Sequence, residues 1–144
     1  MSEQAIHISS SVTQTSLDAN QALADVSRDR SGATVQFLGV VRDHDGGRMV
    51  DRLEYLGHPT ASERLASITA EVLTRHPSTI AVSVHHRVGP LALGDLALVA
   101  AASTAHRAEA FAVVADLVES VKAELPIWKH QYFQDGTDEW VNSP

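Results

Sequence analysis

The chain has 144 residues, 44% of them hydrophobic and 20% charged, with a net charge of -7 at neutral pH and no cysteine. This balance is typical of one globular domain, here residues 1–144, and argues against a general binder of nucleic acids or membrane surfaces, because such proteins need a basic face. Without thiols, disulfides and thiolate metal sites are excluded, and with no secretory leader and no apolar run of about 18–20 residues, we expect a cytoplasmic location.

The N-terminal part of the chain predicts one short helix and two strands. Residues 1–30 form a less regular extension, in which 17–23 suggest a short helix. Residues 33–41 largely alternate between two sets of side chains, as a strand does. A glycine-rich turn over 43–48 leads into a second strand over 50–56. We therefore expect these two strands to form a hairpin.

The middle of the chain predicts a helix and two further strands. Thr60 and Glu63 have the spacing of a capping box, which opens a helix that ends near Arg75, before a His-Pro pair. Residues 79–88 predict a strand. The apolar run over 96–102 predicts a central strand, because such strands are buried on both faces.

The last third of the chain predicts a long helix and a final strand. The helix covers 105–125, with Ser103 or Thr104 as its N-cap and a proline at its end. A strand over 127–133 and a short tail through Trp140 follow it. Because helices and strands are interspersed, we predict an α+β fold with mixed or antiparallel strands and two main helices.

Lys122 lies on the apolar stripe of the predicted long helix. One interpretation is a lysine whose stem covers apolar surface while its ammonium reaches solvent near the helix C-terminus, where the helix dipole favours a cation. The other is a partly desolvated amine, whose lowered pKa makes it usable as a nucleophile or an acid–base group. The stripe repeats at steps of three and four residues and consists of Phe111, Ala115, Val118, Val121 and Leu125.

Lys129 lies in the predicted last strand, on the face that it shares with Ile127, Gln131 and Phe133. A lysine on a strand is usually a solvated or edge charge. Two lysines on either side of a proline bend can instead converge on one pocket, where each lowers the pKa of the other by like-charge repulsion. The pair with Lys122 is therefore more informative than either lysine alone.

A possible anion site is indicated at the other end of the long helix. His106 and Arg107 stand where the helix dipole disfavours positive charge, and a bound anion such as phosphate would resolve this conflict. The alternative is that Arg107 pairs with Asp116, with Glu109 or with another acidic residue. Arg42 follows a strand and precedes the glycine-rich turn, where it is either a solvated hairpin charge or a further anion ligand.

The eight histidines do not predict a metal site. His85 and His86 are adjacent on a predicted strand, so their side chains point to opposite faces and form a poor pair of ligands. His44 and His58 have no partner at a ligand spacing.

Several short segments together resemble the molybdopterin synthase catalytic subunit family, in the family's order and spacing, over roughly residues 32–141. The family's functional positions map onto Lys122 and Lys129 as catalytic residues and onto Arg42, His106 and Arg107 as substrate-binding residues. The matching segments are GVVR at 39–42 with the Asp-His after it, HRVGPL at 86–91, AHR at 105–107 with Phe111, and Lys122 followed by LPIWK at 125–129.

The resemblance implies an α/β hammerhead fold and a sulfurtransferase activity. Sulfur passes from the thiocarboxylate on the C-terminal Gly-Gly tail of a small ubiquitin-like carrier subunit to cyclic pyranopterin monophosphate, which forms the molybdopterin dithiolene after two transfers. The resemblance implies no cofactor and a heterotetramer, in which a homodimer of this chain carries two carriers. As a hypothesis, Lys122 contacts the carrier's terminal carbonyl, and Lys129 is a general acid or base on the pterin side.

The length of the long helix adds a geometric expectation. His106 and Lys122 are sixteen residues apart, about 24 Å at roughly 1.5 Å per residue, which is too far for one pterin phosphate to bridge. We therefore expect a homodimer with two composite sites. Residues 53–59 match the family only loosely, so no substrate contact is carried over there. Some family members have a longer tail that can supply an arginine to the neighbouring subunit, and we expect this contact to be absent or replaced after Trp140.

Two other functions compete with this interpretation. A catalytically silent relative would still bind a ubiquitin-like tail, but the presence of both lysines and Arg42 argues against it. An unrelated phosphate-ester enzyme would use the same basic cluster, but the chain has neither a P-loop nor a Rossmann glycine fingerprint.

Overall fold

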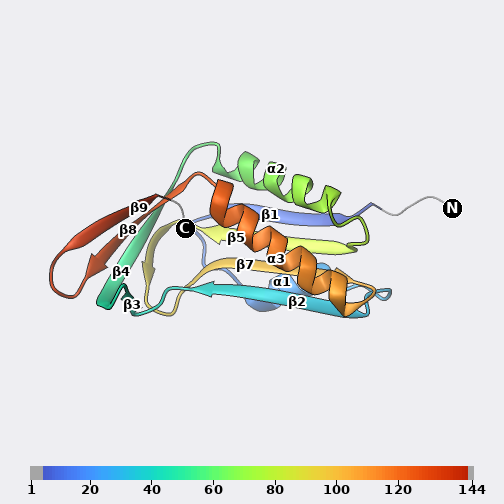
Figure 1. Ribbon diagram of the computed structural model, residues 1–144, viewed down its shortest axis with the longest axis horizontal. Helices are drawn as coiled ribbons and strands as arrows, with labels where there is room; N and C mark the ends of the chain where they lie inside the picture. The colour runs from blue at the N-terminus through green and yellow to red at the C-terminus, as the bar shows by residue number, and fades with distance from the viewer. Residues whose placement is uncertain (1–4, 143–144) are drawn as a thin grey trace.

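The computed structural model describes residues 5–142, which form two β-sheets and three helices (Figure 1). Residues 1–4 and 143–144, at the two ends of the predicted 1–144 domain, lie outside the described residues. The α+β class, the mixed strands and the two main helices are confirmed. The helices are α1 (Ala19–Val26), α2 (Ala61–Thr74) and α3 (Arg107–Glu124).

The first sheet has four strands in the order β1-β5-β7-β2. β1 runs parallel to β5, whereas β5 and β2 are both antiparallel to β7. The predicted central position of the 96–102 run is confirmed, because β7 lies between two other strands and most of its side chains are buried. The strands are β1 (His7–Thr13), β2 (Ala33–Val40), β5 (Ala81–Arg87) and β7 (Leu96–Thr104).

The second sheet has the order β3-β4-β8-β9, with β6 also pairing to β4. Figure 1 shows it standing beyond one end of the first sheet. β9 and β6 were not expected as strands, because their sequences contain charged and turn-forming residues rather than an apolar alternation. The strands are β3 (His44–Asp45), β4 (Arg48–Gly57), β6 (Gly89–Ala92), β8 (Ile127–Phe133) and β9 (Asp138–Asn142).

The predicted hairpin between the strands at 33–41 and 50–56 is wrong. β2 pairs with β7 in the first sheet, whereas β4 pairs with β8 in the second. The pairing register of β2 shifts at Gly39, and the N–H of Val41 then donates to the carbonyl of Asp95, so the chain leaves the first sheet at this point. The glycine-rich turn closes a smaller hairpin, between β3 and the start of β4.

Helices cover both faces of the first sheet. α2 and α3 lie over one face (Figure 1), and their buried side chains form the main core with Val82, Val84 and Ala100 of the sheet. α1 packs on the other face, where Ala22 and Val26 contact the strand positions that point the opposite way. The main core continues into the second sheet through Leu53, Tyr55 and Ile127 of β4 and β8, so the two sheets share one core.

Two predicted helix caps differ from the structure. Thr60 precedes α2 but its side chain makes no cap; its hydroxyl bonds to Nδ1 of His58 at 2.8 Å, so no capping box forms. The N-cap of α3 is His106, because Ser103 and Thr104 are the last residues of β7. The hydroxyl of Ser103 instead donates to the carbonyl of Val26 at 2.6 Å, which ties β7 to the end of α1.

The buried face of α3 is also rotated from the predicted stripe. Phe111 is 61% exposed and Ala115 is exposed as well, whereas Val118, Val121 and Leu125 are buried as expected. The helix lies over β2 and β7, and this packing selects the neighbouring positions. The residues that α3 buries are Ala110, Val113, Val114, Leu117, Val118 and Val121.

Within residues 5–142, no helix has both the length and the apolar character needed to cross a membrane.

Candidate active site

A cavity of about 330 Å³ opens where the two sheets meet. Its walls come from both sheets and from the C-terminal end of α3, so its residues are distant in sequence but share one pocket. Its lining combines apolar side chains with several convergent polar groups, and such a combination suits a ligand site. The lining residues are the 37–42 segment, Leu53, Tyr55, His86, Ala97, Leu98, Lys122, Lys129 and Gln131.

Lys122 lies in the last turn of α3, and Lys129 lies on β8. The helix ends at Glu124, with Leu125 as its C-cap, since Pro126 cannot continue it, and the chain then turns back into β8. This bend brings the two lysines to one cavity. They are the only lysines in the sequence. The structure thus brings together the two predicted catalytic residues, while their chemical roles stay predictions.

The environment of Lys129 disfavours its charged form. Its side chain is half-buried on the face that it shares with the buried Ile127, Gln131 and Phe133, as the strand parity predicted. Burial lowers the pKa of the Lys129 amine, and the nearby positive charges of Arg42 and Lys122 lower it further. Like-charge repulsion therefore contributes as expected, but desolvation is the larger cause.

Arg42 reaches the same cavity from the segment that follows β2. Its guanidinium donates to Oδ1 of Asp45 at 3.4 Å, and the amide of Gln131 donates to Oδ2 of the same carboxylate at 2.7 Å. The hydrogen bond from Gln131 is the main cause that lowers the pKa of Asp45. Neither Asp45 nor Gln131 was recognised from sequence as part of a site, because their contact joins strands 86 residues apart.

His86 and Tyr55 are two further lining residues that sequence reasoning missed. His86 is 1% exposed, and its Nδ1 lies 2.8 Å from the carbonyl of Arg87, to which it donates as the protonated nitrogen. Burial lowers the pKa of His86 to about 4, so the ring is neutral at pH 7. The Tyr55 ring meets it edge-on at 4.9 Å, and burial raises the pKa of the Tyr55 hydroxyl. This part of the cavity is therefore poorly hydrated.

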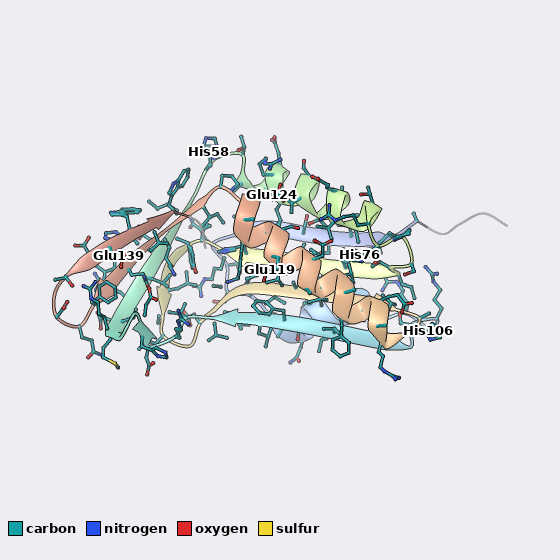
Figure 2. All side chains as sticks on the ribbon, in the orientation of Figure 1. His58, His76, His106, Glu119, Glu124 and Glu139 are labelled. Carbon is teal, nitrogen blue, oxygen red and sulfur yellow. The ribbon has the colours of Figure 1, made fainter. Side chains whose placement is uncertain are left out.

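His106 and Arg107 lie away from this cavity, at the opposite end of α3. Figure 2 shows His106 at one end of the helix and Glu124 at the other. Both His106 and Arg107 are exposed. Asp116, one alternative partner of Arg107, is engaged elsewhere: it accepts two hydrogen bonds from Arg75, at 2.9 and 3.0 Å, and lies 2.8 Å from Nε2 of His76. One chain thus holds three of the five predicted site residues together and displays the other two on its surface.

The histidines considered as metal ligands have other contacts. His85 points away from His86, as predicted, and its ring bonds to Ser11 at 2.7 Å and to Ser83 at 2.9 Å. His44 bonds to its neighbouring aspartate, and His58 bonds to Thr60. Among the residues that the structure describes, no group of three or more His, Asp or Glu side chains is placed to hold a metal ion.

Comparison with known proteins gives consistent matches over most of the chain. The family model described as "MoaE protein" matches residues 12–124. Molybdopterin synthase catalytic subunit 1 of Mycobacterium tuberculosis is 40% identical over 131 residues, which cover 90% of this chain and 88% of that protein. The crystal structure of molybdopterin synthase from Staphylococcus aureus matches with a TM-score of 0.83 at 32% identity, over 91% of this chain and 95% of that chain.

A further solved structure is similar in fold alone. It comes from Helicobacter pylori 26695 and is a complex of subunits 1 and 2 of molybdopterin-converting factor. The match has a TM-score of 0.67 at 17% identity and covers 92% of this chain and 88% of that chain.

Proposed function

The chain belongs to the MoaE protein family, a family of molybdopterin synthase catalytic subunits, and from this premise we propose that it transfers sulfur to cyclic pyranopterin monophosphate to form the molybdopterin dithiolene. The observation that carries the proposal is the cavity in which both lysines of the chain meet Arg42. Amines can donate protons to a reacting carbonyl group, and a guanidinium can bind a phosphate. The proposed reaction requires no cofactor.

The sulfur donor is a small ubiquitin-like carrier subunit that presents a thiocarboxylate at the end of its Gly-Gly tail. Because this chain has no cysteine, the sulfur must arrive from another molecule. In this scheme Lys122 contacts the terminal carbonyl of the tail and helps to pass the sulfur on. The fold-level relative from Helicobacter pylori, which is a complex of two different subunits, is in keeping with such a partner.

Lys129 is the general acid or base on the pterin side of the cavity. An amine with an ordinary pKa near 10.4 exchanges protons poorly at neutral pH. Burial lowers the pKa of Lys129 and so brings it nearer to the working pH. This shift supports the catalytic interpretation over that of a solvated edge charge.

The substrate phosphate is bound by Arg42 together with His106 and Arg107 of a second copy of the chain. His106 lies at the far end of α3 from the lysine cavity, so one copy cannot supply both halves of the site. β2 is an edge strand of its sheet, and it exposes the apolar side chains of Leu38 and Val40 beside the cavity. These features favour a homodimer with two composite sites, which becomes a heterotetramer with two carriers in the cytoplasm.

The proposed reaction is tested directly with purified components. Incubating the protein with a thiocarboxylated carrier and cyclic pyranopterin monophosphate should yield a dithiolene product. The same carrier with an ordinary carboxylate end is the control and should yield none. Absence of product, although the thiocarboxylated carrier binds the protein, would rule the activity out.

The shared site is tested by mixing two defective variants. Lys122→Ala removes the lysine half of a site, and Arg107→Ala removes part of the phosphate half. If the two halves come from different copies, each mixed dimer has one intact site, and random exchange should restore roughly a quarter of the wild-type activity. No recovery, despite demonstrated subunit exchange, would count against a shared site.

A further inference from the structure

Positive charge is concentrated in the lining of the cavity. Arg42, Lys122 and Lys129 all line it, and no acidic side chain is among the described residues of its walls. Like charges this close raise the free energy of the folded protein unless a counter-charge lies nearby. Asp45, just behind the wall, contacts two of the lining residues, Arg42 and Gln131.

Both oxygens of the Asp45 carboxylate are engaged. Gln131 donates to Oδ2 at 2.7 Å, and Arg42 donates to Oδ1 at 3.4 Å. Gln131 is 3% exposed, and a buried amide that lost this acceptor would carry a desolvation cost. The short bond to Gln131 is therefore the anchor of the carboxylate. The longer bond, to the exposed guanidinium of Arg42, is the weaker of the two.

The backbone also fixes Asp45 in place. It is the last residue of β3 and pairs with Arg48 of β4 across a turn. The two turn residues, Gly46 and Gly47, have φ of 58° and 78°, which side-chain-bearing residues rarely adopt. This two-residue turn sets the position of Asp45 relative to β4, and β4 pairs with β8, which carries Gln131 and Lys129, with one register shift between Val50 and Arg52.

Asp45 and Lys129 also influence each other electrostatically. The charge of Asp45 raises the pKa of Lys129 against the effect of burial, and the charge of Lys129 helps to lower the pKa of Asp45. The attraction thus stabilises the charged form of both groups. From behind the cavity wall, Asp45 opposes the desolvation that pushes Lys129 toward its neutral form.

We propose that Asp45 is a positioning residue of the sulfur-transfer site: anchored by Gln131, it holds the Arg42 guanidinium at the cavity and supplies a negative charge that acts on the Lys129 amine. That the site transfers sulfur rests on the function proposed above, whereas the positioning role of Asp45 rests on its observed contacts. Because the bond to Arg42 is long, an arriving phosphate competes with Asp45 for that guanidinium. Asp45 then remains bonded to Gln131 and near Lys129.

The first test is Asp45→Asn, which keeps the size of the side chain and removes its charge. The two lysines of the chain, labelled with 13C at Cε, give two titrating signals, which a Lys129→Arg variant assigns. In Asp45→Asn the pKa of Lys129 should fall. The matched control is Asp43→Asn, which makes the same charge change in the same segment at a residue that bonds to His44 instead. An equal effect of both variants on Lys129 would overturn the proposal.

The second readout is the affinity for inorganic phosphate, measured by calorimetry. Removing the carboxylate that competes for Arg42 should tighten binding by roughly two- to fivefold, the scale of an exposed ion pair. Asp43→Asn should leave this affinity near the wild-type value. Weaker or unchanged binding in Asp45→Asn would show that the carboxylate does not hold Arg42.

A charge-relocating double variant separates a role of the charge from a role in folding. Asp45→Asn combined with Gln131→Glu exchanges the acid and the amide of the pair and keeps one carboxylate next to Lys129. The pKa of Lys129 should return toward the wild-type value. If Asp45→Asn fails to fold, Gln131→Leu takes its place, since it frees the carboxylate and should also lower the pKa of Lys129. An unchanged Lys129 titration in the folded variant would contradict the proposal.

These measurements do not depend on sulfur transfer, so they test the positioning role of Asp45 independently of the proposed activity. A wild-type protein that makes no dithiolene, while Asp45→Asn shifts the Lys129 titration as expected, would refute the activity and keep the positioning role. A wild-type protein that makes dithiolene, while Asp45→Asn behaves like Asp43→Asn, would keep the activity and refute the positioning role.

Discussion

The two ends of α3 differ in whether other parts of the chain form a cavity around them. At the C-terminal end, Lys122, although exposed itself, joins the half-buried Lys129 and the buried His86 in a cavity whose walls come from both sheets. At the N-terminal end, His106 and Arg107 are exposed to solvent. The first end is a candidate site whose residues are brought together by tertiary packing. The second displays two polar side chains on the surface, and under our proposal they act only when a second copy of the chain meets them.

The largest effect on activity is expected when a lysine is removed from the cavity end of α3. Lys122→Ala should lower the rate of dithiolene formation by on the order of 10²–10⁴-fold, the usual contribution of a positioned acid–base group, and Lys129→Ala should also lower it. Product formation in single turnover measures the effect. Glu124→Ala, at an exposed position in the same last turn of α3, is the control. Full turnover by both lysine variants would refute the mechanism.

Removing charge from the displayed end should have a smaller effect on the reaction. Arg107→Ala should lower kcat/KM by about 10- to 100-fold, because a hydrogen bond to a charged group contributes roughly 1.5–3 kcal/mol. Thermal unfolding should be unchanged, since Arg107 is exposed. Arg64→Ala, exposed on α2, is the control. A large loss of stability would mean that Arg107 supports the fold rather than a ligand.

The smallest expected effect concerns the hydration of the cavity around His86. His86 titrates near pH 4 when folded and near pH 6.5 when unfolded, so the unfolded chain binds the proton first as the pH falls. Stability is therefore highest above pH 6.5 and should decrease by about 1–2 kcal/mol between pH 7 and pH 5 on account of this residue.

Urea unfolding at both pH values measures this dependence. His86→Gln, which has no group titrating in that range, should reduce the difference between the two pH values by that amount. His44→Gln on the exposed hairpin is the control. An undiminished difference in His86→Gln would show that the histidine is better hydrated than its burial indicates.

Local patterns predicted most of the elements of this fold but not their pairing. The strands at 33–40 and 81–87 and the helices at 61–74 and 107–124 follow from apolar periodicity and from proline and glycine positions. The pairing of β4 with β8 joins residues 70 or more positions apart, and no local pattern between them predicts it. A short turn therefore suggested the wrong partner for β2. β1 escaped prediction because its three serines weaken the apolar signal.

The candidate site shows the same division. Lys122, Lys129 and Arg42 were recognised through an ordered set of motifs, and the structure brings them to one cavity. Asp45 and His86 were not assigned to a site, since a carboxylate in a glycine-rich turn and a histidine on a strand are both common. Their significance comes from tertiary neighbours, Gln131 for one and Tyr55 for the other.

The uninterrupted course of α3 has a consequence for how this chain can evolve. Each residue of an α-helix advances about 1.5 Å and turns about 100° around the axis, so Arg107 and Lys122 are separated by a fixed length and a fixed angle. One inserted residue would swing Arg107 through more than a quarter of a turn relative to the lysine cavity, whereas a substitution on the exposed face leaves both quantities unchanged. Natural variation in this helix should therefore accumulate in its composition, while its residue count between these two positions stays constant.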